Sequence, residues 1–329
     1  MVKAKKFILK KQFSGAPKPT DVEIVEEELP PIKDGEFLAE AIYLSVDPYQ
    51  RVYTQNVGQV MIGLQVAKII ESKLDGYPVG KYVVGHFGWR THTISKTLTI
   101  PFGIIPDFGN LPVSLALGAL GMTGNTAYFG FLEICKPQKG ETVVVSGAGG
   151  AVGSHVGQIA KIIGCKVIGI LGDDQKGKYI TEELGFDHYI NYKKGNVKEE
   201  LTKYAPVGID CYFDNVGGDT STAVISLMNK FGRISVCGCI SIYNIGTNNL
   251  VNFSPNAGVF IRNELRMEGF MVTRWTERWS EGIEQNLKWI KEDKLKYKET
   301  ITEGFENIIN AFIDMLNGKN TGKAIVKVK

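Results

Sequence analysis

A glycine-rich segment in the middle of the chain contains residue types that bind phosphate groups. It reads VVVSGAGGAVGSHVGQIAK, from Val143 to Lys161, with four glycines in seven residues between a β-branched run and a helical pattern. Glycine lets backbone amides approach a pyrophosphate, and a helix N-terminus favours its negative charge. We therefore expect Gly150 and Gly153 to be the positions that approach a bound dinucleotide most closely.

The spacing of these glycines departs from the usual G-x-G-x-x-G motif. Counted from Gly147 and Gly149, the sixth position is Val152, so the spacing that fits is Ala148, Gly150, Gly153, or equally Gly147, Gly150, Gly153. A glycine-rich turn can also occur only because the chain reverses sharply. The strand before it, the helix after it and further βα units downstream favour dinucleotide binding.

Residues at the end of the next predicted strand bear on which nucleotide binds. A 2′-phosphate needs small or basic residues there, whereas an acidic side chain binds a ribose 2′-hydroxyl. The segment reads GILGDDQKGK, in which Gly172 leaves room for a phosphate that Lys176 or Lys178 could neutralise. Asp173 or Asp174 could instead bind the hydroxyl or cap the next helix. On balance the pattern favours NADP.

Support for a metal site is weak. The first cysteine is Cys135, and His86 and His92 are six residues apart in a predicted loop. Cys237 and Cys239 follow a predicted strand, where neighbouring thiols pack more often than they ligate. We therefore expect no bound metal.

The other two histidines, His155 and His188, are interpreted as surface or hydrogen-bonded residues rather than catalysts. With no metal site and no evident acid–base pair, hydride chemistry would depend on hydroxyl groups, the cofactor ribose and backbone dipoles.

The pattern of predicted secondary structure changes near residue 121. Before it, short β-like runs such as 22–29 and 37–44 alternate with turn signals and predict a β-rich domain. After it, strands expected at 142–145, 166–171, near 189, 209–213, 233–237 and 265–272 alternate with helices, including one over 174–184. This spacing predicts a parallel, doubly wound α/β sheet. A final helix over 304–316 and the strand KAIVKV could return to the first domain.

Composition narrows the class of protein. The 329 residues are 43% hydrophobic and carry 38 Lys and Arg against 35 Asp and Glu, a net charge of +3 that gives no support for nucleic-acid binding. No apolar stretch has the length of a signal peptide core or a membrane span. Five scattered cysteines indicate free thiols in a reducing compartment. We expect a soluble cytoplasmic protein.

Several long segments together resemble the zinc-independent medium-chain dehydrogenases/reductases, and among them the prostaglandin reductase 1 family. The likeness covers nearly the whole chain. Where zinc alcohol dehydrogenases have Gly-His-Glu, this chain has Gly63, Leu64 and Gln65. The segments that carry the resemblance are LSVDPYQRVY, MIGLQVAKIIES, LALGALGMTGNTAYFGFLEIC, GAVGSHVGQIAK, DCYFDNVGG, KFGRISVCGCISIYN, ELRMEGFMV and GKAIVKV.

The resemblance implies a doubly wound parallel Rossmann sheet plus a β-rich GroES-like catalytic domain. The catalytic domain would comprise 1–121 and 300–329, and the NADP-binding domain 122–299. The implied activity is NADPH-dependent reduction of the carbon–carbon double bond of α,β-unsaturated ketones and aldehydes derived from lipids. It also implies a cytoplasmic homodimer without zinc.

Site residues are implied by the same matches. Tyr243 matches the tyrosine proposed to bond the substrate carbonyl, and Thr123 matches the segment beside the nicotinamide. The remaining cofactor contacts match Gly150, Ala151, Val152, Gly153, Lys176, Tyr192, Asn215, Cys237, Gly238, Cys239, Ile240, Ser241, Ile242, Phe270, Met271, Val272 and Asn320.

Two positions depart from the family pattern. Asp173 stands where the family often has a small residue, which bears on NADP discrimination, and 244–258 differs from the proline-rich segment of the mammalian enzymes. Two alternatives stay open: NADP+-dependent oxidation of an allylic lipid hydroxyl, as in leukotriene hydroxydehydrogenases, and a nucleotide-binding structural protein with little activity.

Overall fold

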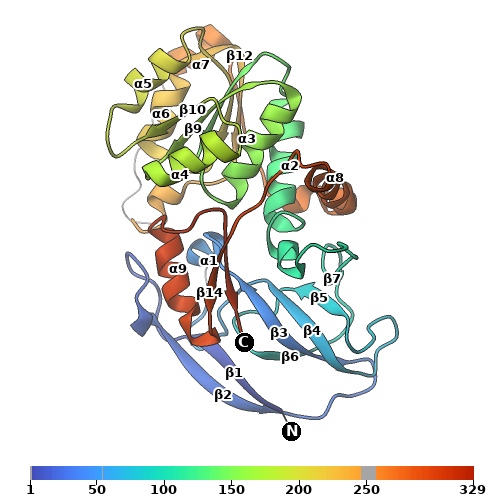
Figure 1. Ribbon diagram of the computed structural model, residues 1–329. Coiled ribbons are helices and arrows are strands. Elements are labelled where there is room, and N and C mark those ends of the chain that lie inside the picture. Colours follow the sequence, from blue (N-terminus) through green and yellow to red (C-terminus); the bar gives the residue numbers. More distant parts are fainter. Residues whose placement is uncertain (1, 54, 246–256) are drawn as a thin grey trace. The chain divides into compact units, whose positions relative to one another are not determined.

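The computed structural model describes residues 2–53, 55–245 and 257–329 (Figure 1). The chain divides into two compact units: unit 1 comprises Met1–Gly121 and Glu299–Lys329, and unit 2 comprises Met122–Lys298. No helix in the described parts of the chain is long and apolar enough to cross a membrane.

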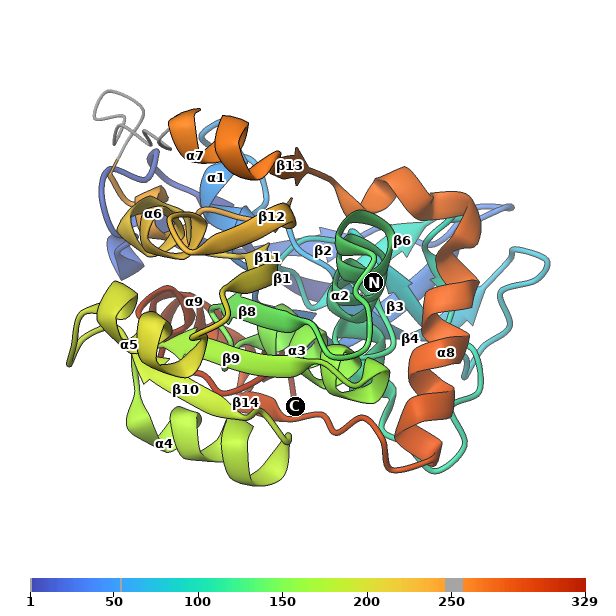
Figure 2. The same cartoon turned by 90° about the horizontal axis from the view of Figure 1, so that it is seen from above.

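Unit 2 is built on a parallel sheet, as the alternating pattern predicts. Among the described residues it has six strands in the order β10-β9-β8-β11-β12-β13, and Figure 2 shows the central ones side by side. The strands are β8 (Thr142–Ser146), β9 (Lys166–Leu171), β10 (His188–Asn191), β11 (Ile209–Asp214), β12 (Met228–Val236) and β13 (Arg266–Gly269).

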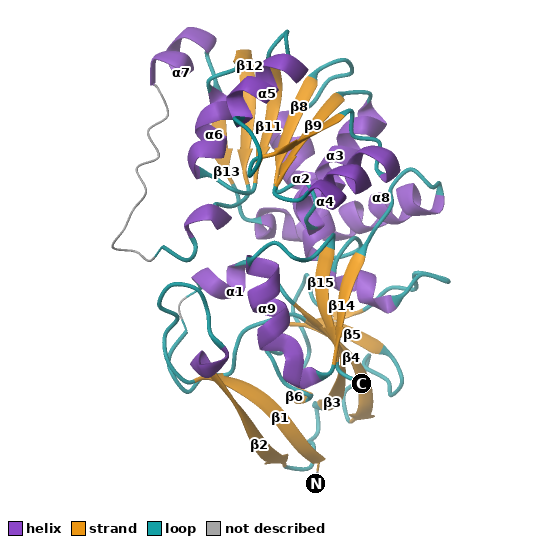
Figure 3. Ribbon diagram, turned by 60° about the vertical axis from the view of Figure 1, so that its left-hand side comes forward, coloured by secondary structure: helices purple, strands orange, loops and turns teal. Residues whose placement is uncertain are grey.

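Helices cover both faces of this sheet because successive side chains of each strand point to opposite sides. Val143 and Val145 join the core with α2 and α3, whereas Val144 joins the core with α5, α6 and α7 (Figure 3). The helices of unit 2 are α2 (Met122–Cys135), α3 (Ala151–Ile163), α4 (Asp174–Lys178), α5 (Val197–Tyr204), α6 (Gly218–Ile225), α7 (Ala257–Asn263) and α8 (Trp279–Lys291).

Strand order reverses between β8 and β11. From β8 the chain moves outward through β9 to β10, and then returns to the other side of β8 as β11. In open α/β sheets, ligands bind outside the carboxyl ends of the strands at such a switch point. The sheet therefore predicts a site where β8 and β11 end.

Two expected elements were longer than those observed. The strand expected over 265–272 is only β13, because its partner β12 ends at Val236, opposite Gly269. The helix expected over 174–184 is α4 followed by a π-helical segment, Tyr179–Glu183.

Unit 1 is mainly antiparallel. Among the described residues its larger sheet has the order β14-β15-β3-β4-β5-β7, with β6 also on β3, while β1 and β2 form a separate two-stranded sheet. The C-terminal strand β15 runs antiparallel to β3. Its elements are β1 (Val2–Leu9), β2 (Val22–Leu29), β3 (Phe37–Ser45), α1 (Tyr49–Val52), β4 (Gln65–Ser72), β5 (Tyr82–Gly85), β6 (His92–Ser95), β7 (Gly103–Ile104), β14 (Glu299–Glu303), α9 (Ile308–Leu316) and β15 (Lys323–Lys327).

A buried ion pair joins β15 to the segment that follows β3. Lys323 Nζ lies 3.0 Å from Asp47 Oδ1, and both side chains are 4% exposed. The ammonium group also donates to the carbonyl oxygens of Val46 and Ala324, each at 2.8 Å. All three ammonium protons thus have acceptors, which offsets the cost of burying the charge.

We expect Lys323→Met to destabilise unit 1 by about 3 kcal/mol or more, because Asp47 would remain buried without its cation. Lys327→Met is the matched control on the same strand, since the ion pair of Lys327 with Glu303 is exposed and worth less than about 1 kcal/mol. Urea unfolding of both variants measures the difference. Equal losses would show that burial of the Lys323 pair has no special energetic role.

Candidate functional site

The glycine turn between β8 and α3 is packed too closely for side chains. A Cβ atom added to Gly153 would lie 2.4 Å from the carbonyl oxygen of Gly147, and one added to Gly150 would lie 3.3 Å from the same oxygen. Gly147 itself has φ of 62°, a conformation that favours glycine. These contacts explain why the observed glycine spacing is needed here.

The N-terminus of α3 is open to an anion. Gly150 is the N-cap, no side chain caps the helix, and the first turn contains no acidic residue. The first amides of a helix lack intrahelical acceptors, and the dipole of this 13-residue helix favours negative charge at them. The turn thus has the shape and electrostatics that fit a pyrophosphate group.

The ends of β9 and β10 form a corner beside this turn. A Cβ atom on Gly172 would lie 2.8 Å from Cε1 of Tyr192, so the tyrosine ring covers the glycine. A Cβ atom on Gly149 would lie 3.1 Å from Cδ of Lys176, so the lysine stem lies against the glycine turn. Gly172, Lys176 and Tyr192, separated in sequence, therefore meet next to the turn.

Positive charge gathers in this corner. Burial lowers the pKa of the Lys176 ammonium group; nearby Asp173 opposes this effect, and the charge of Lys193 adds to it. The Lys193 ammonium lies 5.9 Å from the centre of the Tyr192 ring. A bound phosphate would relieve the repulsion between Lys176 and Lys193. Lys178, the other lysine considered for this role, has an exposed side chain.

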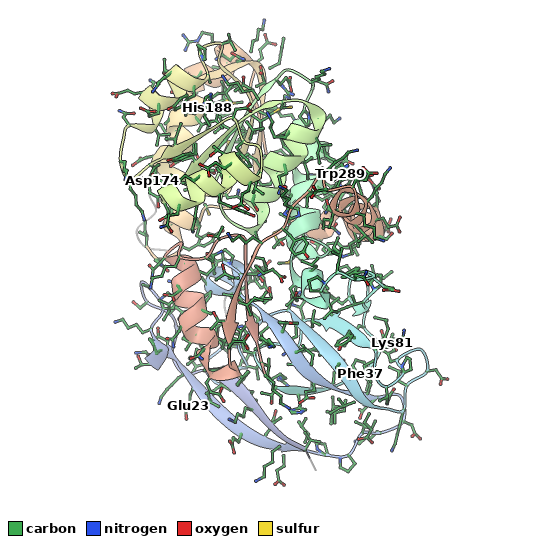
Figure 4. The ribbon with its side chains drawn as sticks, viewed as in Figure 1. Glu23, Phe37, Lys81, Asp174, His188 and Trp289 are labelled. Carbon is green, nitrogen blue, oxygen red and sulfur yellow. The ribbon has the colours of Figure 1, made fainter. Side chains whose placement is uncertain are left out.

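The two acidic residues of the corner have protein partners. Asp173 caps α4, because its Oδ1 accepts from the backbone N–H of Lys176 at 2.9 Å. Asp174, labelled in Figure 4, accepts from Asn191 Nδ2 at 2.7 Å and pairs with Lys194. Helix capping and ion pairing thus account for both carboxylates without a ribose.

A second part of the site lies at the end of β11. Asn215 donates from Nδ2 to the carbonyl oxygen of Ser146 at 2.7 Å, and from its backbone N–H to Ser146 Oγ at 2.9 Å. Ser146 ends β8, immediately before the glycine turn. Asn215 is therefore fixed at the switch point.

The segment 237–243 follows β12 and packs on the same edge. A Cβ atom on Gly217 would lie 3.2 Å from Cβ of Cys239, and Ser241 Oγ donates to the carbonyl oxygen of Val216 at 2.6 Å. Ile240–Ile242 form a 3-10 turn that ends at Tyr243. The described part of 244–258 is 244–245 and 257–258; residues 246–256 lie outside the described residues.

Tyr243 carries a hydroxyl group that can act as a hydrogen-bond donor. Its hydroxyl oxygen accepts from the backbone N–H of Cys239 at 3.3 Å and would lie 3.1 Å from a Cβ atom on Gly238. Burial raises the pKa of Tyr243 to about 12, so the phenol is protonated at neutral pH. The backbone bond uses only a lone pair of the phenol oxygen, and the hydroxyl also has a side-chain hydrogen bond with Cys239.

The two thiols of this segment are not ionised. Burial raises the pKa of Cys237 to about 12, and burial also raises the pKa of Cys239. A protonated thiol is a poor metal ligand and a poor nucleophile. In the described parts of the chain no three His, Cys, Asp or Glu side chains are arranged to hold a metal.

The remaining expected cofactor contacts of unit 2 differ in how exposed their side chains are. Phe270 is half-buried and packs its ring against α2, since a Cβ atom on Gly130 would lie 2.2 Å from its Cζ. Met271 is exposed and Val272 is buried. Thr123 is buried in the first turn of α2.

Other residues lie in unit 1. Asn320 donates from Nδ2 to the carbonyl oxygen of Gly322 at 2.8 Å. Leu64 is apolar and buried, and Gln65 Nε2 donates to the carbonyl oxygen of Arg90 at 3.0 Å. Neither Leu64 nor Gln65 presents a metal ligand where the zinc enzymes have one.

Two residues near the site carried no sequence prediction. Lys193 adds charge to the corner, and Asp214 accepts several hydrogen bonds where β11 ends. The signal for Asp214 was an acidic residue directly after the apolar run of a predicted strand. For Lys193 it was a second basic residue next to Tyr192.

Comparison with known proteins decides the family. Residues 5–100 match the N-terminal domain of oxidoreductases, and residues 151–289 match the zinc-binding dehydrogenases. Prostaglandin reductase 1 of Sus scrofa is 51% identical, with 99% of this chain and 100% of that protein covered; the Bos taurus protein is 49% identical with the same coverage. The chain belongs to the prostaglandin reductase 1 family.

Other members of the wider group are also similar. A 2-alkenal reductase (NADP(+)-dependent) of Nicotiana tabacum is 37% identical, with 99% of this chain and 98% of that protein covered. The structure of CurA from Vibrio vulnificus in complex with NADPH has a TM-score of 0.91 and 36% identity, with 99% of each chain covered. The prostaglandin reductase 1 family therefore shares its fold with a solved NADPH complex.

His155 is not on the surface; of the two expected environments it has the second, since its ring has a hydrogen bond with the backbone of Ala151. This histidine is 4% exposed on α3, one residue before the core residue Val156, and its Nε2 has no hydrogen-bond partner among the described residues. Burial lowers the pKa of His155 to about 4. His188 lies partly exposed on β10, with its ring stacked 4.3 Å from that of Tyr204.

We expect His155→Leu to weaken the acid sensitivity of unit 2. The folded-state pKa is lowered, so below the unfolded value of about 6.5 the unfolded state binds the proton more readily and stability falls toward pH 4. Between pH 7 and 5 this loss is about 2 kcal/mol. In urea unfolding, the free energy of unfolding of His155→Leu should therefore fall by about 2 kcal/mol less than that of the wild type between pH 7 and pH 5. His188→Leu, the control, should change this fall much less. If His155→Leu has the same difference in free energy of unfolding between pH 7 and pH 5 as the wild type, His155 is not a neutral, buried imidazole.

Proposed function

We propose that this protein catalyses NADPH-dependent reduction of a carbon–carbon double bond conjugated to a ketone or aldehyde. The observation that carries the proposal is a half-buried Tyr243, with a raised pKa, on the same sheet edge as a glycine turn that leads into an uncapped helix N-terminus. The names of the relatives, prostaglandin reductase and 2-alkenal reductase, support this substrate class. The NADPH complex of the similar structure supports the cofactor.

The proposed cofactor contacts begin at the glycine turn. Gly150, Ala151, Val152 and Gly153 would hold the pyrophosphate through backbone amides. Lys176 would hold the 2′-phosphate, and Tyr192 would line the adenosine end of the cofactor. The other proposed contacts are Thr123, Asn215, the segment 237–243, residues 270–272, and Asn320.

Bound NADPH would supply hydride to the β-carbon of the enone. Negative charge then grows on the carbonyl oxygen, and the Tyr243 hydroxyl would donate a hydrogen bond to it. Such a donor, held in place before the reaction, typically contributes about 10²- to 10³-fold in rate. A hydrogen bond from the backbone N–H of Cys239 holds the phenol oxygen, and the substrate oxygen would replace the Cys239 thiol as the partner of the hydroxyl. The α-carbon would take its proton from solvent.

The finer assignments are also proposals. Residues 1–121 with 300–329 would form a GroES-like catalytic domain, and 122–299 the NADP-binding domain. The protein would be a zinc-independent cytoplasmic homodimer that acts on enones or alkenals derived from lipids. Support for zinc independence comes from Leu64 and Gln65, which offer no ligand.

Reduction is tested by following NADPH absorbance with a 2-alkenal or another enone as substrate. We expect oxidation of NADPH by the wild-type protein, and a fall in kcat of about 10²-fold for Tyr243→Phe with little change in NADPH affinity. The absence of NADPH oxidation with every enone, while NADP+ is reduced by an allylic alcohol, would favour the dehydrogenase alternative. A loss of NADPH affinity in Tyr243→Phe would show that its role was assigned wrongly.

The 2′-phosphate assignment is tested with Lys176→Met, which removes the charge but keeps an apolar stem against Gly149. Affinity for NADPH should fall about 10- to 100-fold, since a charged hydrogen bond contributes about 1.5–3 kcal/mol, while NADH affinity should change little. Lys178→Met is the matched control, because Lys178 is exposed. Fluorescence titration measures both affinities. Equal effects of the two substitutions would mean that Lys176 has no specific phosphate contact.

A further inference from the structure

Asp214, the last residue of β11, is a buried carboxylate at the switch point. It is 2% exposed, although carboxylates are almost never fully buried unless they are paired. Its strand lies between β8, which leads to the glycine turn, and β12, which leads to the Tyr243 segment. Asp214 is therefore placed between the two halves of the site in unit 2.

Hydrogen-bond donors surround this carboxylate. An ionised carboxylate accepts more strongly than a neutral amide, so a charge at this point holds several groups at once. Oδ1 accepts from Tyr212 Oη at 2.8 Å, from the backbone N–H groups of Val216 and Gly217 at 2.9 Å each, and from Ser146 Oγ at 3.0 Å; Oδ2 accepts from Ser221 Oγ.

One set of bonds connects Asp214 to the glycine turn. The Ser146 hydroxyl donates to Asp214 and accepts from the backbone N–H of Asn215 at 2.9 Å. Ser146 directly precedes Gly147, whose carbonyl oxygen contacts Gly153. The carboxylate thus fixes the point from which the turn starts.

A second set connects Asp214 to the Tyr243 segment. The carboxylate holds the turn 215–217, and the carbonyl oxygens of that turn and of Asp214 itself accept bonds from the segment 237–243. The donors are the backbone N–H groups of Cys237 at 2.8 Å and Gly238 at 3.1 Å to Asp214, Ile240 at 3.3 Å to Asn215, and Ser241 at 3.2 Å to Val216. Tyr243 in turn accepts from Cys239.

We propose that Asp214 is a positioning residue whose charge sets the geometry of Tyr243 relative to the glycine turn. It transfers no proton and touches no substrate; it acts through the turn 215–217. The catalytic consequence rests on the proposed function. The alternative is that the carboxylate contributes only to folding stability, as expected for Asp210 at the opposite end of β11.

Asp210 provides the matched control. Its Oδ2 accepts from the backbone N–H of Thr142 at 2.8 Å and its Oδ1 accepts from Asn229 Nδ2 at 2.8 Å. It lies on the same strand with a similar number of oxygens engaged, but at the amino edge of the sheet, away from the turn and the Tyr243 segment. Both aspartates can be replaced by isosteric asparagine.

The first experiment compares steady-state kinetics. Asp214→Asn should lower kcat about 10- to 100-fold with less than about a 3-fold change in KM for NADPH, and Asp210→Asn should leave both unchanged. If Asp214 acts through Tyr243, adding Asp214→Asn to Tyr243→Phe should cost less than about 3-fold. If the double variant instead loses kcat by the product of the two single-variant reductions, the proposal is overturned. An inactive wild-type protein would instead count against the proposed function.

The second experiment does not need activity. Amide hydrogen exchange should become faster in both 215–218 and 237–243 in Asp214→Asn, and in neither segment in Asp210→Asn. Faster exchange confined to 215–218 would show that the carboxylate does not hold the Tyr243 segment. If Asp214→Asn does not fold, Ser146→Ala tests the other link: it removes one donor, leaves the charge, and should lower kcat with faster exchange in 215–218. No change in either measurement would overturn the proposal.

Discussion

The close contact between Gly153 and the carbonyl oxygen of Gly147 is the constraint on which the site depends. A Cβ atom there would lie 2.4 Å from that oxygen, so α3 can start directly behind β8 only with glycine. That start leaves the first amides of α3 uncapped. The same turn gives the stem of Lys176 a surface at Gly149 on which to lie. Backbone packing thus determines where negative charge can be placed.

Charge in the corner beside the turn is arranged by local structure. The backbone N–H of Lys176 donates a hydrogen bond to the Asp173 carboxylate, which therefore caps the start of α4 and is not needed to hold a ribose hydroxyl. The stem of the same lysine lies against Gly149 of the glycine turn. The departure from the family at Asp173 therefore has a structural role that is compatible with a phosphate beside Lys176.

Much of this arrangement could be predicted from the sequence. The parallel sheet followed from the alternation of apolar runs and helical patterns, and β9 coincides with the expected strand 166–171. The burial of His155 could not be predicted, because it depends on which face of α3 packs inward. The length of β13 depends on where β12 ends, and the position of the Phe270 ring depends on the space that Gly130 leaves on α2. Each of these is decided by tertiary packing rather than by local pattern.

Asp214 illustrates the same limit in the site itself. In sequence it is one acidic residue after an apolar run, a pattern equally typical of a turn or a helix cap. Its five donors come from β8, from β11, from the turn 215–217 and from α6, and these come together only once the sheet has formed. A buried charge that binds several elements favours one arrangement of them, because any other would leave the carboxylate without its donors. The position of Tyr243 is therefore a property of the folded sheet edge as much as of the segment that carries it.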